Sequence, residues 1–218
     1  MKRRELLTST LKTLSAAAVA GVSLSSINAA NTCQTTAEQP EGPFYPIKDQ
    51  TDKDNDLTQM RGNTKKAIGE VVVLKGIVNN ELCRPVEGAI VEIWQACDTG
   101  KYNHPGDPNT SKLDPNFQYW GRAITDVHGN YSFKTIKPGA YPAGNNWVRP
   151  PHIHVKVHLR GYEELTTQLY FAKNKRLNDK DLLLMRLTEE ERKSVIVDFE
   201  TKGNIYPVGQ FNITLKGF

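Results

Sequence analysis

The chain has 218 residues, 38% of them hydrophobic and 24% charged, which is typical of a folded protein rather than a disordered one. Its apolar runs are all shorter than the roughly 20 residues that cross a bilayer, so the sequence predicts no membrane span. The formal net charge of +4 falls to about +1 without the first 30 residues, which excludes the basic surface of a nucleic-acid-binding protein.

Residues 1–30 have the pattern of an export signal. The basic start Lys2-Arg3-Arg4 precedes a weakly apolar stretch over 14–22, and small residues at 29 and 30 offer a cleavage site. The other interpretation is an amphipathic helix of the folded domain. We expect a periplasmic or extracellular protein, and the pattern leaves open whether export uses the general secretory or the twin-arginine route.

Three cysteines follow this leader, at positions 33, 83 and 97. An oxidising compartment permits disulfides. Cys83 and Cys97 flank one predicted strand at a spacing that a hairpin or strand return closes. The sequence therefore favours a bond between these two and leaves Cys33 unpaired.

Residues 31–68 form a polar, proline-containing arm, which we expect to be irregular and to wrap over a core. From residue 69 onward, short β-branched and aromatic segments alternate with turn residues. The predicted strands are 71–78, 89–96, 131–133, 152–159, 166–171, 194–199 and 210–215. This spacing predicts one all-β domain over 69–218, a β-sandwich of the transthyretin type with long irregular loops.

Helical structure is expected in only one or two short segments. Thr188 and Glu191 form a capping box, and Glu189 and Glu190 suit the positive end of a helix dipole. We expect this helix to end near Lys193, where strand residues resume.

The segment 149–159 is the most informative in the chain. Side chains two apart on a strand share a face, so Ile153, Val155 and Val157 are predicted to pack into the sandwich. His152 and His154 share the other face at a Cα separation of roughly 6.5–7 Å, from which two imidazoles can converge on one metal ion. We expect this face to line a cleft, the alternative being a solvated polar strand.

The histidine pair alone leaves the chemistry open. His158 lies too far along the strand to join the pair easily, and no Asp or Glu stands at a companion spacing for a site of two histidines and one carboxylate. A zinc hydrolase built on His152 and His154 would also need a third ligand and an activated water.

Two tyrosines change this assessment. Tyr102 and Tyr141 stand in loops flanked by Gly and Pro, where functional residues are often presented, and neither fits a core alternation. Taken singly, each is explained equally by packing or hydrogen bonding. A tyrosinate is nevertheless a hard anionic oxygen ligand that suits a trivalent cation, and a bound metal favours its deprotonation.

With these residues in place, the sequence resembles the intradiol ring-cleavage dioxygenases, and within them the iron-bearing β subunits that act on protocatechuate. The resemblance covers roughly 41–215. It is carried by PVEGAIVEIWQA at 85–96, LDPNF at 113–117, GR at 121–122 with TD at 125–126, GNYSF at 129–133, TIKPGAYP at 135–142 and RPPHIH at 149–154.

The resemblance implies a non-haem Fe(III) centre and assigns residues to it. The positions that match the family's iron ligands are Tyr102, Tyr141, His152 and His154. Tyr141 is also implied to act in catalysis, together with Arg149, which matches an active-site arginine, and Gln168, which matches a glutamine near the catechol ring. The stretch from Tyr141 to Arg149 is shorter than in typical protocatechuate enzymes, and Ala143 stands where those carry tryptophan, so the substrate pocket is expected to differ.

The implied reaction cleaves a catechol-type ring between its two hydroxylated carbons with O2, giving a cis,cis-muconate. Protocatechuate or a related catechol is the implied substrate, and the implied assembly is an oligomer, either of this chain or with a related α subunit. Arg149 is explained alternatively by a structural ion pair, and Gln168 by hydrogen bonds to the backbone. The alternative function is a non-catalytic, exported transthyretin-like binding module, which would need no ligand set of this kind.

Overall fold

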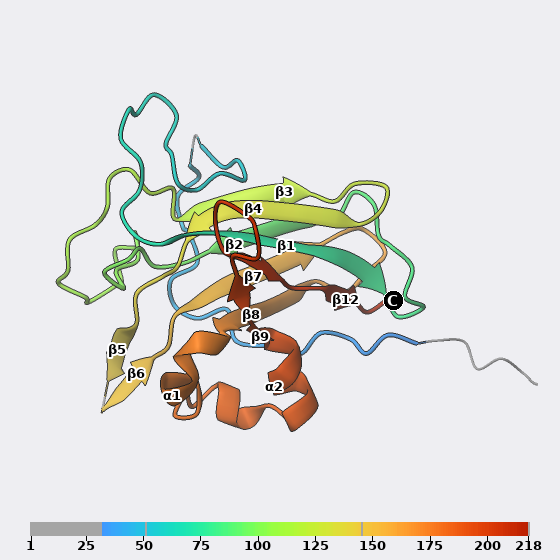
Figure 1. Cartoon of the computed structure of the whole chain (residues 1–218). Coiled ribbons are helices and arrows are strands. Elements are labelled where there is room, and N and C mark those ends of the chain that lie inside the picture. Colours follow the sequence, from blue (N-terminus) through green and yellow to red (C-terminus); the bar gives the residue numbers. More distant parts are fainter. Residues whose placement is uncertain (1–31, 51, 145, 218) are drawn as a thin grey trace, which may run out of the picture. The chain divides into compact units, whose positions relative to one another are not determined.

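The computed structural model describes residues 32–50, 52–144 and 146–217 (Figure 1). The predicted export signal lies outside the described residues. Strands dominate and the helices are short, which confirms the all-β class. Among the described residues, no helix combines the length and the apolar character needed to reach across a membrane.

The first sheet is organised around β1 (Val71–Asn80), whose β-branched side chains alternate between buried and more exposed positions. β4 (Asn130–Ile136) pairs with β1 in antiparallel orientation. β11 (Val208–Gln210) and β12 (Ile213–Leu215) pair with it in parallel, and β10 (Phe199–Glu200) extends the sheet beyond β11.

The second sheet carries the histidine strand at its centre. Its strands, in spatial order, are β3 (Trp120–Ile124), β2 (Ile90–Trp94), β7 (His152–His158), β8 (Leu165–Phe171) and β9 (Ile196–Val197). All neighbours are antiparallel except β8 and β9. The register places Trp94 opposite His154 on one side of β7 and Tyr170 opposite His152 on the other.

Apolar side chains of both sheets form one continuous core. Leu74 of β1, Phe133 of β4, Val91 of β2 and Val155 of β7 are among its fully buried members. Burying each side chain of this kind contributes about 1.5–3 kcal/mol. The core therefore holds β7 by its apolar face and leaves its histidine face for other contacts.

The remaining elements lie outside the two sheets. β5 (Tyr141–Gly144) and β6 (Trp147–Arg149) form a separate hairpin. The helical segments are η1 (Ala172–Asn174), α1 (Lys175–Asn178), η2 (Leu184–Arg186) and α2 (Glu189–Val195). Figure 1 shows α1 beside β6, and α2 beside β8 and β9. The capping box of α2 is confirmed, since Thr188 Oγ1 accepts from the Glu191 amide at 3.2 Å, and the helix ends at Val195, two residues beyond the expected end.

The strand prediction misses β3, β5 and β6, and it merges β11 and β12 into one segment. The single strand predicted over 194–199 is also wrong, because this range begins in α2 and divides into β9 and β10, which belong to different sheets. β3 was not predicted because it contains Gly121, and a glycine weakens the pattern of a strand. A Cβ at Gly121 would lie 2.5 Å from Leu57 Cδ1 and 2.7 Å from the Asp54 carbonyl oxygen. The glycine is therefore required where the arm packs against the sheet, a contact that the local sequence does not reveal.

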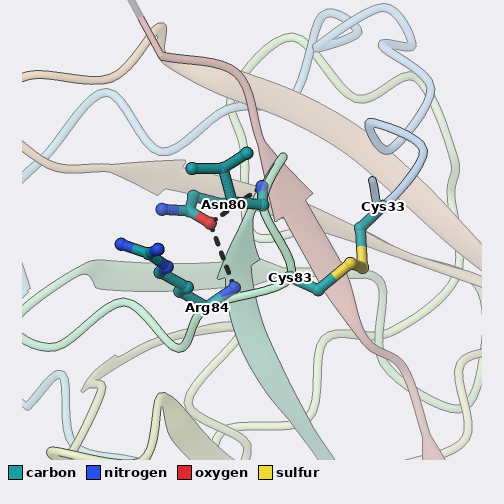
Figure 2. Close-up of a disulfide and its surroundings, with 5 residues drawn as sticks. Cys33, Asn80, Cys83 and Arg84 are labelled. Carbon is teal, nitrogen blue, oxygen red and sulfur yellow. Dashed lines mark hydrogen bonds between the residues drawn. A yellow bond between two sulfur atoms is a disulfide. The ribbon is translucent and has the colours of Figure 1, made fainter. Parts of the chain in front are cut away.

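The predicted Cys83–Cys97 disulfide is wrong. Cys33 is bonded to Cys83 across 50 residues (Figure 2). Cys97 is a free thiol buried in the core. Cys83 lies in the turn after β1, in the left-handed region at a φ of 58°, where the first residues of the arm pass. The Cys33 amide donates to the Glu81 carbonyl at 2.8 Å, so the backbone aligns the arm with this turn. Cys97 points inward and cannot reach it.

From this anchor the arm follows the edges of the sheets. The Thr36 amide donates to the Thr214 carbonyl at 3.1 Å, and the Gln39 amide donates to the Thr166 carbonyl at 2.9 Å. Over the described part of 32–68, the arm contains no helix or strand beyond an isolated bridge at Asp56. These bonds fix the path of the arm between the disulfide and the histidine face of β7.

Candidate metal centre

Both faces of β7 are buried, and the histidines occupy the face away from the apolar core. His152 and His154 are 2% and 3% exposed, whereas Ile153 and Val155 on the opposite face are fully buried. The predicted alternation is therefore confirmed, but the histidine face is covered rather than open. The Trp94 indole stacks on the His154 ring, with centroids 4.7 Å apart and planes 12° apart.

Two glycines bring the tyrosines to this face. Tyr102 lies in the loop after β2, and Tyr141 begins β5 instead of lying in a loop as predicted. A Cβ at Gly139 would lie 2.2 Å from the Asp98 carbonyl oxygen, and one at Gly100 would lie 2.6 Å from the Ala140 carbonyl oxygen. The absence of side chains there lets the two loops touch, and the Tyr102 and Tyr141 rings meet edge to face at 5.6 Å.

The Tyr102 hydroxyl lies between the two imidazoles. It is 3.2 Å from Nε2 of His152 and 3.1 Å from Nε2 of His154. The Tyr141 ring is 5.7 Å from the His152 ring. All four side chains predicted as metal ligands are thus brought together from the loop after β2, from β5 and from β7.

Electrostatics favour neutral imidazoles at this centre. Burial, and then the nearby positive charge of Arg149, lower the pKa of both His152 and His154 well below the usual value. In each neutral imidazole, one of the two ring nitrogens therefore keeps a free lone pair at neutral pH. Burial raises the pKa of the Tyr102 and Tyr141 phenols, while the Arg149 charge opposes that rise.

A metal cation fits this donor set. His152 Nδ1 lies 2.7 Å from the Pro150 carbonyl oxygen, so it carries the proton and directs the Nε2 lone pair toward Tyr102. The Nε2 atoms of both imidazoles then face one phenol, which has a single proton to give, while His154 Nδ1 has no hydrogen-bond partner among the described residues. A cation at this point would satisfy both lone pairs and convert the phenol to a phenolate, a hard oxygen ligand.

The site extends to a buried guanidinium on β6. Arg149 Nε donates to Asp181 Oδ2 at 2.8 Å, and Nη2 donates to Gln168 Oε1 at 2.7 Å and to the Tyr170 hydroxyl at 3.2 Å. The structural ion pair considered for Arg149 is therefore present, with Asp181. The backbone hydrogen bond considered for Gln168 is present as well, since its Nε2 donates to the Pro40 carbonyl at 2.7 Å.

An aromatic wall and a cavity complete the surroundings. Phe44 of the arm packs against Tyr102 at 4.8 Å and Tyr141 at 6.5 Å between ring centroids. A cavity of about 470 Å³ opens beside Tyr102, lined by the arm at 46–50 and by the loop that contains His104. A larger hollow of about 760 Å³ over β1, β3 and β4 contains none of the predicted site residues.

Comparisons with known proteins agree with this geometry. Residues 40–217 match the family model described as "Dioxygenase". The chain is 38% identical over 181 residues to the protocatechuate 3,4-dioxygenase beta chain of Burkholderia cepacia, covering 80% of this chain and 77% of that one. The chain belongs to the intradiol ring-cleavage dioxygenase family. It is also 32% identical over 144 residues to catechol 1,2-dioxygenase of Candida albicans, covering 60% of this chain and 44% of that one.

Solved structures of intradiol dioxygenases share the fold. The dioxygenase domain of a carbohydrate-binding fusion from Streptomyces sp. SirexAA-E superposes with a TM-score of 0.62 at 28% identity, covering 85% of this chain and all of that one. An intradiol ring-cleavage dioxygenase from Tetranychus urticae gives a TM-score of 0.64 at 21% identity, covering 84% and 95%, and so supports the fold alone.

Family membership makes this chain an enzyme rather than a non-catalytic binding module. The zinc-hydrolase interpretation also lacks its third ligand. Across the residues that the structure describes, no group of three or more His, Cys, Asp or Glu side chains is placed to hold a metal. The donor set that the intradiol resemblance implies is a different one, with two tyrosines and two histidines.

The sequence analysis missed two residues that contact Arg149, Asp181 and Tyr170, and a third, Gln39, that contacts Tyr170. Asp181 follows α1, Tyr170 lies on β8, and Gln39 lies on the arm. Tyr170 could have been found, because it stands two residues after Gln168 and so shares its face of a strand. Gln39 and Asp181 gave no comparable signal, since each lies far from Arg149 in the chain and in an irregular segment.

Proposed function

We propose that this dioxygenase holds Fe(III) and cleaves protocatechuate or a related catechol between the two hydroxylated carbons, with both atoms of O2 entering a cis,cis-muconate. The proposed ligands are Tyr102, Tyr141, His152 and His154. The observation that carries the proposal is the convergence of both imidazole Nε2 atoms on the Tyr102 oxygen, at 3.2 and 3.1 Å, beside Tyr141. Bound there, Fe(III) supplies a Lewis acid that draws electron density from a catecholate and makes its ring reactive toward O2.

The two tyrosines are proposed to have different roles. The oxygen of Tyr102 is contacted by both imidazoles, which suits a permanent ligand. Tyr141 is the more exposed of the two, at 8% against 3%, and lies at the start of a short hairpin. As a phenolate, Tyr141 would be the base that accepts one hydroxyl proton of the incoming diol.

Arg149 is proposed to stabilise the negative charge that develops on the ring during oxygen attack. Its guanidinium is held on two sides, by Asp181 and by Gln168, and cannot lose its charge. Gln168 contacts Arg149 rather than the metal centre, so we assign it a positioning role.

The substrate assignment rests on similarity and on the site's surroundings. The 38% identical relative is named for protocatechuate. The stretch from Tyr141 to Arg149 is a short hairpin in which Ala143 is exposed, so no large side chain stands at position 143. We also propose an oligomeric assembly, of this chain alone or with a related subunit, which light scattering of the purified protein tests.

We further propose that the protein is exported. The disulfide between Cys33 and Cys83 supports this, because such bonds persist in oxidising compartments. Fractionation of expressing cells with an antibody to the mature chain tests it, and retention of the protein in the reducing cytoplasm would contradict it.

Metal analysis and oxygen uptake together test the proposed reaction. We expect iron in equimolar amount with the chain, and oxygen consumption with protocatechuate, catechol or hydroxyquinol that yields an intradiol product. Zinc in place of iron, or an extradiol product, would contradict the proposal. Faster turnover of catechol than of protocatechuate would select a related catechol as the substrate and leave the reaction type standing.

A further inference from the structure

Gln39 reaches into the active site from the irregular arm. Its side chain is buried, while its neighbours Glu38 and Pro40 are exposed. Its Nε2 donates to Thr167 Oγ1 at 3.0 Å and to the Gln168 carbonyl at 2.7 Å. Its Oε1 accepts from the Tyr170 hydroxyl at 2.9 Å. Every polar atom of this amide is therefore used, and the acceptor is directed at a residue that contacts Arg149.

The Tyr170 hydroxyl has one proton and two acceptors within reach. These are Gln39 Oε1 at 2.9 Å and Gln168 Oε1 at 3.2 Å. Arg149 Nη2 donates to both the Tyr170 oxygen and Gln168 Oε1. When the Tyr170 hydroxyl donates its hydrogen bond to Gln39, Gln168 Oε1 is free to accept from Arg149. Without Gln39 the phenol would donate to Gln168 Oε1 instead, and this oxygen would then have to divide its two lone pairs between the phenol and Arg149.

The backbone of the arm is fixed independently of this side chain. The Gln39 amide donates to the Thr166 carbonyl, Thr167 Oγ1 donates to the Ala37 carbonyl at 2.7 Å, and Gln168 Nε2 donates to the Pro40 carbonyl at 2.7 Å. These bonds flank Gln39 on both sides. A replacement of similar length at position 39 therefore alters the polar contacts and leaves the path of the arm in place.

We propose that Gln39 is a positioning residue of the dioxygenase. By accepting a hydrogen bond from the Tyr170 hydroxyl, it directs Arg149 toward Gln168 and holds the guanidinium at the active site. This inference rests on the proposed function of Arg149. It makes the arm a part of the catalytic apparatus as well as a cover for the histidine face.

A double-mutant cycle tests the inference with the full-length, iron-loaded protein, and kcat is expressed per bound iron. Gln39→Met keeps the length of the side chain and removes both the acceptor for Tyr170 and the donor to Thr167 and Gln168, and the Tyr170→Phe background separates these two losses. We expect kcat to fall about tenfold with KM changed less than about twofold, because Arg149 acts in the transition state. In a Tyr170→Phe background, where no phenol proton exists, the same replacement should lower kcat less than about threefold.

Two further measurements separate positioning from folding. The visible absorption of iron-loaded Gln39→Met should match that of the unmodified enzyme, and Glu38→Gln, on the exposed side of the arm, should leave kcat unchanged. A crystal structure of Gln39→Met should show Arg149 Nη2 beyond hydrogen-bonding distance of Gln168 Oε1. Equal losses of kcat in both backgrounds, or an unmoved Arg149, would overturn the inference. Failure of the proposed function would instead appear as inactivity of the unmodified, iron-loaded enzyme.

Discussion

Both faces of β7 are buried over His152–Val155, but they are stabilised in different ways. Ile153, Val155 and Val157 pack into the apolar core, where contacts are nondirectional and many side chains of similar volume would serve. His152 and His154 lie against tyrosines, an indole and the arm, where each buried polar atom needs a particular partner. We infer that the apolar face tolerates substitution and that the histidine face does not.

The largest expected effect comes from the histidine face. His154→Ala removes one of the four proposed metal donors and the stacking partner of Trp94. Bound iron and ring-cleavage activity should both fall below detection, while the circular dichroism spectrum of the sandwich persists. His158→Ala is the matched control, because His158 lies on the same face of β7 at its outer end, half-buried. Loss of iron from both variants would contradict the assignment.

Arg149→Met distinguishes the two roles of the guanidinium. We expect kcat to fall about 100-fold, the scale on which one charge-stabilising donor acts. Stability should fall by about 3–5 kcal/mol as well, since the buried Asp181 loses its partner.

The double variant Arg149→Met/Asp181→Leu removes both charges of this pair. Chemical denaturation should show that stability recovers, while kcat per bound iron stays low. If kcat recovered together with stability, the role of Arg149 would be limited to its structural ion pair with Asp181.

The disulfide anchors the arm that covers the histidine face, so its removal should act on stability. Closing a loop of 50 residues is worth about 4 kcal/mol in the chain-entropy estimate. Cys33→Ser/Cys83→Ser should lose about this much free energy of unfolding in urea. The unmodified protein should lose a similar amount when reductant is added, and the double variant should be insensitive to reductant. Sensitivity of the double variant would point to Cys97 instead.

The smallest effect is expected on the apolar face. Ile153→Val deletes one buried methylene group of the core and should cost about 1 kcal/mol of unfolding free energy. Iron content and kcat per iron should remain unchanged, which urea denaturation and steady-state assays would show. A loss of iron from this variant would mean that the two faces are coupled through the backbone of β7.

This contrast also explains what the sequence could and could not predict. The alternation from His152 to His158 predicts which face of β7 enters the core, because the period of a strand is a local property. The proposed ligand tyrosines and Arg149 were reached through the family resemblance. The structure places Tyr102 and Tyr141 beside His152, and it pairs Tyr141 with Arg149 in the β5–β6 hairpin.

Contacts that join distant segments were out of reach of local patterns. Nothing around Cys33 indicates that it meets the turn at Cys83, 50 residues away, and the local spacing favoured the wrong partner. Asp181 likewise reaches Arg149, and Gln39 reaches Tyr170, only through the paths of the segment after α1 and of the arm. Such pairings depend on tertiary packing, which sets where irregular backbone runs.

The central claim is that two phenolates and two imidazoles surround one ferric ion, and visible absorption tests it most directly. The iron-loaded protein should be burgundy from tyrosinate-to-iron charge transfer. Tyr102→Phe and Tyr141→Phe should each shift or abolish the band, whereas Tyr131→Phe, an equally buried phenol that donates to the Phe211 carbonyl in the other sheet, should leave it unchanged. A colourless iron-loaded protein, or a band that survives both site substitutions, would contradict the account.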